Sequence, residues 1–386
     1  MFEPSEHRPT EAIVDLNAIQ HNVRLMLDQL TSEQKLYATV KANAYGHGAV
    51  PVAKAALEAG AKGLLVATVD EAIELRTNGL SQVPILVLGL TDPRGIAELL
   101  HYNITITVSD SDFFRLAYQQ LEATNQLSLL DLYHLKFHLA LDTGMGRIGL
   151  RTVAEVEQFI EDVSAFKWVE WEGAFTHFAT AGGGPQDYIE YQFEQWQQLI
   201  AVVPDTVPLK HFANTAMGMW HPYEPKSDII RFGIGMYGID PLDRPLAELP
   251  EFERQLQPAL QLISEIIYTK KVPKGHSISY GATYTTTTDE WIATIPIGYA
   301  DGWLRRYSVI DVLVGGVACP VVGTINMDQM MIRLPEALPI GTPVTLIGKD
   351  GHLENHASEL ARKVDTISYE IFCGISNRVP RIYLKD

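Results

Sequence analysis

Eight short apolar segments alternate with amphipathic segments between residues 35 and 234, and this alternation constrains the fold more than any other feature. The apolar segments have the length of buried strands, and the intervening segments carry hydrophobic residues at helical spacing. The expected strands are 35–41, 63–67, 84–88, 104–108, 133–141, 169–176, 208–213 and 229–234. Eight such units within about 200 residues predict an α/β fold, a TIM-type (β/α)8 barrel. A doubly wound sheet is the alternative, but it gives no reason for eight similar units.

Three helices are expected before about Pro250, and a different pattern follows it. A helix is expected over 19–30 behind Asn17 as its N-cap, and two more over 153–163 and 189–200. Beyond residue 250, short alternating or apolar runs separated by turns predict a mainly-β domain with one helix at 358–363. The expected domains are therefore a barrel at 1–250 and a C-terminal β domain at 251–386.

Charge and cysteine content exclude several classes of function. A net charge of −17 argues against nucleic acid as a partner, since phosphate-backbone binding needs clustered Lys and Arg. The two cysteines, Cys319 and Cys373, have no paired spacing, so no disulfide framework and no metal site are expected. No run has the length of a membrane span, and the N-terminal segment has no apolar signal core. These features predict a cytoplasmic protein.

Lys41 ends the first expected strand and is followed by the small-residue segment Ala42-Asn43-Ala44 and by Tyr45. Loops that follow the strands of an α/β fold project catalytic groups. A lysine held there beside apolar residues has a lowered amine pKa and can form a Schiff base with a carbonyl cofactor. Taken alone, Lys41 is equally consistent with a solvated lysine at a strand end.

Polar and glycine-rich segments also follow four later strands of the expected barrel. They are 142–147, 176–178, 214–215 and 231–238. The C-terminal ends of barrel strands meet on one rim, so these segments are predicted to form one site with Lys41. Individually each segment has a plain structural reading as a turn, a core histidine or an ion pair.

In these motifs the chain resembles the alanine racemase family, which combines a barrel with a β domain and uses pyridoxal 5′-phosphate (PLP). The resemblance is carried in collinear order by segments 40–48, 142–149, 176–180, 231–238, 279–284, 298–302 and 326–329, with Tyr369 and residues 378–381 completing it. It covers essentially the whole chain.

The resemblance implies a two-base mechanism in a homodimer with shared active sites. Lys41 would hold PLP as a Schiff base and act as one base at Cα, and Tyr280 of the other subunit would act on the opposite face. Met327, also from the partner, would contribute at the substrate carboxylate.

The resemblance also implies how the cofactor is held. Arg231, supported by His177, would contact the pyridine nitrogen, and an arginine there keeps that nitrogen unprotonated. Arg147 would contact the phenolic oxygen of the cofactor and the substrate carboxylate. The other expected cofactor-binding residues, mainly around the phosphate, are Tyr45, Asn214, Thr215, Gly233, Ile234 and Tyr369.

Four positions depart from the family pattern. Ala140 stands where many members carry a carbamylated lysine that orients the arginine, so a bound anion such as chloride is expected near Arg147 instead. Thr215 replaces a serine and keeps the hydroxyl. Gly182 and Thr324 replace an Asp and an Arg at the substrate entrance, which predicts a wider mouth.

The expected activity is PLP-dependent interconversion of L- and D-alanine, an isomerase reaction that supplies D-alanine for peptidoglycan. A serine-preferring or broad-specificity racemase is one alternative, and a non-catalytic PLP-binding barrel is another. A Schiff-base aldolase without cofactor would not need Arg231.

Overall fold

The computed structural model describes residues 4–221 and 223–385 and divides into two compact units. The barrel unit consists of residues 23–44 and 52–236. The β unit consists of the described residues within 1–22, 45–51 and 237–386. This division is interleaved along the chain, whereas the sequence predicts one boundary near residue 250. The cause is strand β1 (Glu11–Asp15), which pairs with β10 (Leu260–Glu265) and β20 (Arg381–Leu384) in a sheet of the β unit.

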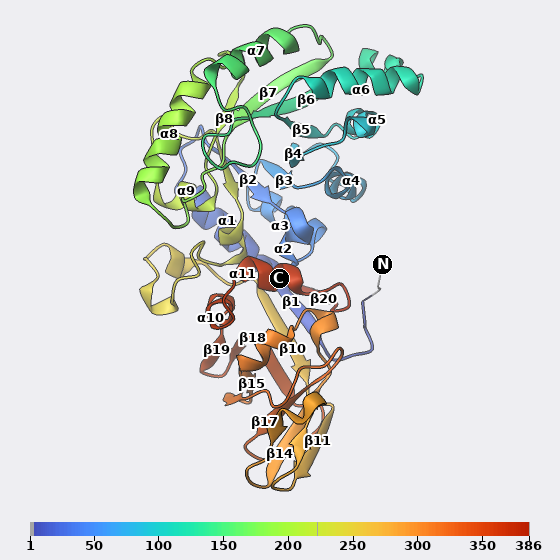
Figure 1. Ribbon diagram of the computed structural model, residues 1–386, viewed down its shortest axis with the longest axis vertical. Coiled ribbons are helices and arrows are strands. Elements are labelled where there is room, and N and C mark those ends of the chain that lie inside the picture. The colour runs from blue at the N-terminus through green and yellow to red at the C-terminus, as the bar shows by residue number, and fades with distance from the viewer. Residues whose placement is uncertain (1–3, 222, 386) are drawn as a thin grey trace. The chain divides into compact units, whose positions relative to one another are not determined.

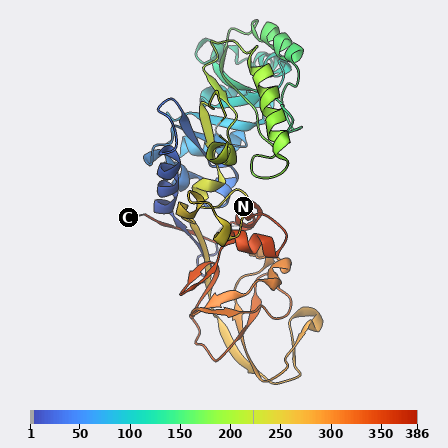
Figure 2. The same cartoon turned by 90° about the vertical axis from the view of Figure 1, so that its left-hand side faces the viewer.

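Eight parallel strands form the sheet of the barrel unit and lie inside its helices (Figures 1 and 2). Their order is β8-β7-β6-β5-β4-β3-β2-β9. The strands are β2 (Lys35–Thr39), β3 (Gly63–Val66), β4 (Ile85–Leu90), β5 (Thr105–Val108), β6 (Leu135–Ala140), β7 (Val169–Phe175), β8 (Leu209–His211) and β9 (Ile229–Phe232). All eight predicted strands are present, each within two residues of its expected ends, so the predicted barrel is confirmed.

The barrel is nearly closed, because two backbone hydrogen bonds join the short strand β8 and the residues just after it to β9 and the residue just before it. Asp228 N–H donates to the carbonyl of Lys210 at 3.1 Å, and Arg231 N–H donates to that of Ala213 at 2.9 Å. Inside, Tyr37, Leu65, Leu86, Leu209 and Ile229 form one apolar cluster. Such filling by strand side chains makes the interior a packed core rather than a pore.

Helix α1 precedes the first strand of the barrel, the later helices connect its successive strands, and their apolar faces pack inward. They are α1 (Leu16–Leu27), α3 (Ala49–Glu58), α4 (Val69–Thr77), α5 (Ile96–His101), α6 (Asp112–Ala123), α7 (Val153–Val163), α8 (Gln186–Ile200) and α9 (Thr215–Trp220). The predicted cap Asn17 is wrong: the Asp15 carboxylate accepts the N–H groups of Asn17 and Ala18, so α1 starts two residues earlier than that cap implies. In α8, Ile189, Phe193 and Trp196 are buried at the predicted spacing.

The β unit contains a sheet with the path β16-β15-β18-β10-β1-β20, to which β19 adds by pairing with β18. A second sheet has the order β11-β14-β17, and β12 pairs with β13. The further bounds are β11 (Tyr268–Val272), β12 (Ser277–Ile278), β13 (Tyr284–Thr285), β14 (Glu290–Ile295), β15 (Val312–Val314), β16 (Val317–Cys319), β17 (Met330–Leu334), β18 (Pro343–Asp350) and β19 (Leu353–Asn355). The predicted helix is α10 (Ala357–Lys363), and α11 (Ser368–Gly374) was not predicted.

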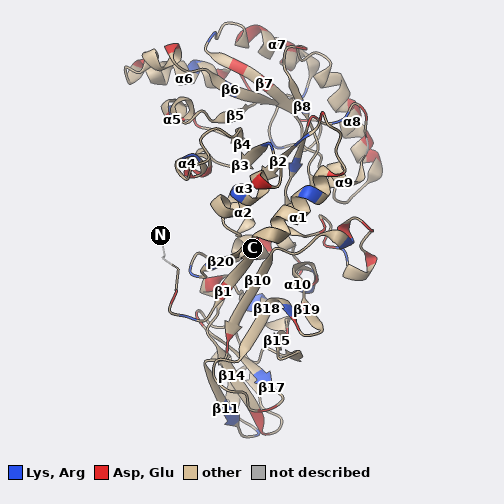
Figure 3. Ribbon diagram, turned by 180° about the vertical axis from the view of Figure 1, so that it is seen from behind, with Lys and Arg blue, Asp and Glu red and all other residues tan. Residues whose placement is uncertain are grey.

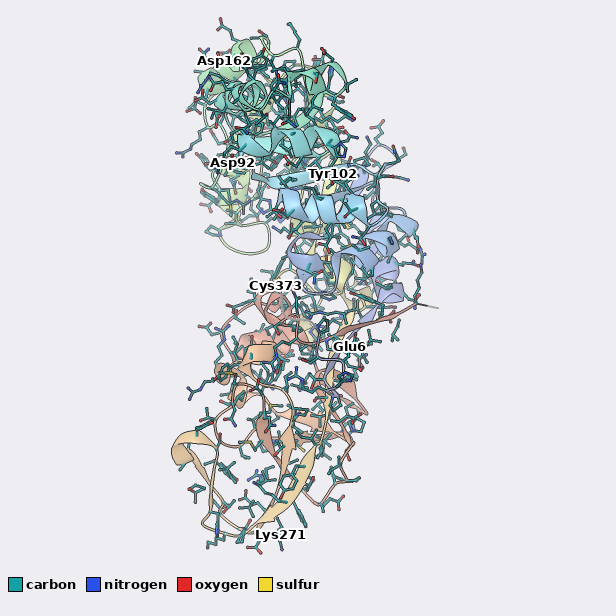
Figure 4. The ribbon with its side chains drawn as sticks, turned by 90° about the vertical axis from the view of Figure 1, so that its right-hand side faces the viewer. Glu6, Asp92, Tyr102, Asp162, Lys271 and Cys373 are labelled. Carbon is teal, nitrogen blue, oxygen red and sulfur yellow. The ribbon has the colours of Figure 1, made fainter. Side chains whose placement is uncertain are left out.

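Charge is distributed over both units, with acidic residues along the outer helices α7 and α8 of the barrel unit (Figure 3). Cys319 is buried, and Cys373 is exposed on α11 (Figure 4). Within residues 4–221 and 223–385, no helix is long and apolar enough to cross a bilayer.

Candidate functional site

Lys41 begins a left-handed turn directly after strand β2. The segment Lys41–Tyr45, labelled α2, has φ values of 53°, 52° and 52° at Ala42, Asn43 and Ala44, and 52° at Tyr45. Residues other than glycine avoid this region because Cβ approaches the following carbonyl, at a cost of about 1–2 kcal/mol per residue. The lysine backbone is therefore presented by a strained segment, as is common at functional sites.

The carboxylate of Glu71, on α4, holds this turn from the side. Oε1 accepts the N–H of Ala42 at 2.7 Å, and Oε2 accepts the N–H groups of Ala67 at 2.7 Å and Thr68 at 3.2 Å. Glu71 is also the third residue of α4 and closes its capping box with Thr68. One side chain thus ties the residue after Lys41 to the end of strand β3. Glu71 is not among the predicted site residues, although the spacing of Thr68 and Glu71 is typical of a capping box.

Arg231 lies on β9 and is 4% exposed, with its two terminal nitrogens bonded to neutral acceptors. Nη1 donates to His211 Nδ1 at 2.9 Å, and Nη2 donates to the carbonyl of Thr176 at 2.9 Å and to His177 Nδ1 at 3.2 Å. Among the described residues, its Nε–H has no hydrogen-bond partner and none of its contacts is an ion pair. Burial, and then the charge of Arg147, lower the pKa of Arg231 to about 9, which leaves it charged at neutral pH.

His177 follows β7 and lies within reach of three cations. Burial lowers the pKa of His177 well below its ordinary value, and nearby positive charges lower it further. In order of effect, these are Arg231, Arg147 and Lys41. The imidazole is therefore neutral and accepts from the arginine. The structure thus brings together four predicted site residues that come from four different strand ends.

The loop that carries Arg147 is held by the buried side chain of Asp142 and the half-buried side chain of Tyr188. Asp142 accepts the N–H groups of Gly144 at 3.1 Å and Gly146 at 2.8 Å. Tyr188, from α8, donates its hydroxyl to the carbonyl of Gly144 at 2.6 Å. Ala140 lies at the end of β6 and is 2% exposed, so its methyl group leaves Arg147 without a charged partner from that strand.

Thr215 and Gly233 meet where β8 and β9 end. Gly233 N–H donates to Thr215 Oγ1 at 2.8 Å, so the hydroxyl proton of Thr215 points to another acceptor. Asn214 caps α9 by accepting the N–H of Met217 at 2.9 Å. Ile234 starts the short 3₁₀ turn that follows β9. These four predicted residues therefore lie together, although the N–H of Gly233 is already used.

The remaining predicted site residues belong to the β unit. The rings of Tyr45 and Tyr369 lie 5.6 Å apart, and burial raises the pKa of both hydroxyls. Tyr280 is 76% exposed and Met327 is 53% exposed. Their loops are joined by Ser279, whose hydroxyl donates to the carbonyl of Thr324 at 2.6 Å and to Asn326 Oδ1 at 3.1 Å.

The amine of a lysine on such a turn can form a Schiff base with a carbonyl compound. Three cations around a neutral imidazole favour a carbonyl compound that carries negative charge. These features define a class: barrel proteins whose rim can bind an anionic carbonyl cofactor through lysine.

Comparison with known proteins narrows this class. Residues 14–241 match the model of the alanine racemase N-terminal domain, and residues 259–383 match that of the C-terminal domain. The alanine racemase of Ligilactobacillus salivarius (strain UCC118) is 44% identical over 378 residues, 98% of each chain. The crystal structure of alanine racemase from E. faecalis is 43% identical with a TM-score of 0.93, covering 99% of this chain and 100% of that one. A histidine racemase from Leuconostoc mesenteroides subsp. sake is 34% identical over 100% of both chains, with a TM-score of 0.89.

The chain belongs to the alanine racemase family, whose members are isomerases.

Proposed function

We propose that the protein interconverts L- and D-alanine with PLP bound on the barrel rim. The observation that carries this proposal is the convergence of Lys41, Arg147 and Arg231 around neutral His177. An amine for the aldehyde, one guanidinium for anionic oxygens and a second guanidinium for the ring nitrogen are groups that suit PLP and an amino acid.

The residues present fit the cofactor. Its phosphate would be held by the Thr215 hydroxyl and by the backbone N–H of Ile234, while the N–H of Gly233 fixes the Thr215 oxygen so that its proton points to the phosphate. Its ring nitrogen would accept the Nε–H of Arg231, the one edge of this guanidinium without a partner among the described residues. Lys41 would form the covalent bond to its aldehyde. Tyr45, Asn214 and Tyr369 are proposed to complete the phosphate site.

Bound PLP withdraws electrons from the substrate Cα and makes its proton acidic. Arg231 stays charged at neutral pH and donates a hydrogen bond without giving up its proton. Arg147 would orient the substrate carboxylate, because a guanidinium binds carboxylates through two parallel hydrogen bonds. Lys41, released from the cofactor by the substrate amine, would remove or return the proton on one face.

Tyr280 of a second subunit would serve the opposite face, with Met327 beside it at the substrate carboxylate. Both side chains are exposed in the single chain, which is what a residue supplied to another subunit requires. The β unit would thus contribute to the partner's active site in a homodimer.

Two further proposals follow from the family. An anion such as chloride would lie near Arg147, because buried Ala140 cannot carry the carbamate that balances this arginine in other members. The D-alanine formed would supply peptidoglycan synthesis in the cytoplasm of a bacterium, since the relatives are bacterial.

The experiment compares wild type with Lys41→Ala and with Lys54→Ala, which removes an exposed lysine from α3 as a matched control. Wild type and Lys54→Ala should show the visible absorbance band of lysine-bound PLP, and they should racemise alanine with solvent deuterium entering at Cα. Lys41→Ala should lose both. A wild-type protein that binds no PLP, or that exchanges no Cα proton, would refute the proposal.

A further inference from the structure

A chain of hydrogen bonds runs from Arg231 across the barrel interior to a carboxylate, and the proposed function uses only its first residue. Arg231 Nη1 bonds to His211 Nδ1 at 2.9 Å, and His211 Nε2 to His138 Nδ1 at 2.8 Å. His138 Nε2 lies 3.4 Å from Glu172 Oε2. The chain therefore passes from β9 to β8, then to β6 and β7.

The groups at the two ends of this series of hydrogen bonds fix which ring nitrogen of each histidine carries its proton. A guanidinium only donates, so His211 Nδ1 must accept and His211 must carry its proton on Nε2. That proton is donated to His138 Nδ1, so His138 in turn carries its proton on Nε2 and donates it to Glu172. A charged imidazole at either position would place two protons between the same two nitrogens. Burial, the largest effect, lowers the pKa of both His211 and His138, in agreement with two neutral rings.

The surrounding residues are shaped to hold this chain. A Cβ atom at Gly173, on β7, would lie 2.6 Å from His138 Nδ1, so only glycine leaves room for that ring. Phe175 stacks on His211 with centroids 5.1 Å apart, and the Arg231 guanidinium carbon lies 5.5 Å from the centroid of Phe175. His211 is 0% exposed and His138 is 1% exposed. Neither ring can exchange its partner for water.

Glu172 is held as a carboxylate at the far end. Thr105 donates its hydroxyl to Oε2 at 3.1 Å, and Lys136 Nζ lies 3.7 Å from Oε1. Desolvation, the largest effect, would raise the pKa of Glu172, but the hydrogen bond from His138, the charge of Lys136 and the hydrogen bond from Thr105 bring the pKa below its ordinary value. Within the described chain, Arg231 has no carboxylate partner of its own, and a buried charge is costly without compensation.

We propose that Glu172 is a positioning residue of the racemase site, which acts through His138 and His211 to balance the charge of Arg231 and fix its orientation. Its negative end polarises two aligned imidazoles, so that Nδ1 of His211 becomes a stronger acceptor for the guanidinium. The hydrogen bond that holds the arginine in place then leaves Nε–H facing the ligand. This inference rests on the proposed function for its catalytic consequence, but the proton arrangement can be tested without activity.

The first test is ¹⁵N NMR of wild-type protein labelled at histidine. Both His138 and His211 should be neutral and protonated on Nε2. A proton on Nδ1 of either ring, or a doubly protonated ring, at neutral pH would overturn the proposal. This measurement needs no variant, so it remains decisive if a substitution prevents folding.

The second test compares Glu172→Gln with Glu170→Gln, which removes an exposed carboxylate from the same strand. Glu172→Gln should lower kcat by about 10- to 100-fold, by analogy with carboxylates that orient metal-bound histidines, with KM changing little. It should also shift the Nε2–H resonances of His138 and His211, and Glu170→Gln should change neither. Equal kcat in the two variants would overturn the proposal. If wild type itself does not racemise alanine, the proposed function fails. The NMR result would still show whether His138 and His211 carry their protons as proposed.

Discussion

The left-handed turn after Lys41 gives the sharpest quantitative prediction. Ala42 is exposed and has φ 53°, and its N–H is bonded to Glu71. Ala42→Gly keeps that bond and buries nothing new, so its effect isolates the backbone strain.

The magnitude follows from two opposing terms. Relief of the left-handed conformation returns about 1–2 kcal/mol. Glycine loses more conformational entropy on folding, which costs about 0.5–1 kcal/mol. The variant should therefore be more stable than wild type by up to about 1.5 kcal/mol, and the middle of each range gives about 0.8 kcal/mol, or about 2–3 °C in Tm for a domain of this size. A turn that is freer to move should also present Lys41 less well and lower kcat.

Differential scanning calorimetry at one fixed cofactor concentration is the assay, because bound ligand itself raises Tm. Ala154→Gly is the matched control, since Ala154 is exposed in the ordinary right-handed helix α7. That control should lose about 0.5–1 kcal/mol. The opposite signs of the two substitutions are the point of the experiment. If Ala42→Gly lowers Tm as Ala154→Gly does, the turn is not strained as its dihedral angles indicate.

Three further predictions concern catalysis and pH. Tyr280→Phe should cripple proton abstraction mainly from L-alanine, and equal loss in both directions would contradict the two-base assignment. Removal of chloride should weaken substrate binding at Arg147, measured as KM in chloride and in a large inert anion; an unchanged KM would contradict an anion site. Histidines of the unfolded chain take up protons below about pH 6.5. In the folded protein, buried His138, His177 and His211 stay neutral, because their pKa values are lowered. The free energy of unfolding should therefore fall by about 1 kcal/mol for each histidine between pH 6.5 and 5.5. A Tm that stays constant over this range would contradict neutral histidines.

The barrel could be predicted from sequence because its signal is local and repeated. Each strand is a short apolar run, and each helix has its own period, so errors at the ends do not change the count. Two failures have physical causes. The pairing of β1 with β10 and β20 joins residues some 250 and 370 positions apart, and no local pattern records such a contact. Helix α11 was missed because Ser368–Gly374 is rich in aromatic and β-branched residues and ends in glycine, whereas α10, of the same length, consists mainly of strong helix formers.

The site residues also fall into those that could be predicted from the sequence and those that could not. Lys41, Arg147, His177 and Arg231 could be placed on one rim, because each lies at or just after the end of a recognisable strand. Glu71, His138 and Glu172 could not be assigned a role, because their roles depend on which strands become neighbours and on Gly173 leaving space for a ring. A residue that acts through another residue leaves no motif of its own.

The costly features of the barrel unit are concentrated around one site. They are a run of left-handed residues after Lys41, a buried guanidinium without an ion-pair partner among the described residues, and histidines whose pKa values are held low by burial. Elsewhere the unit follows ordinary rules, with capping boxes at Thr68 and Thr152 and an apolar interior cluster. Unfavourable features gathered in one place are expected at a binding site and are hard to explain in a structural core. The hydrogen bonds from Arg231 through His211 and His138 to Glu172 agree with this view. They supply a negative charge from within the protein, and they reach the guanidinium on the side away from the Nε–H edge that we assign to the cofactor.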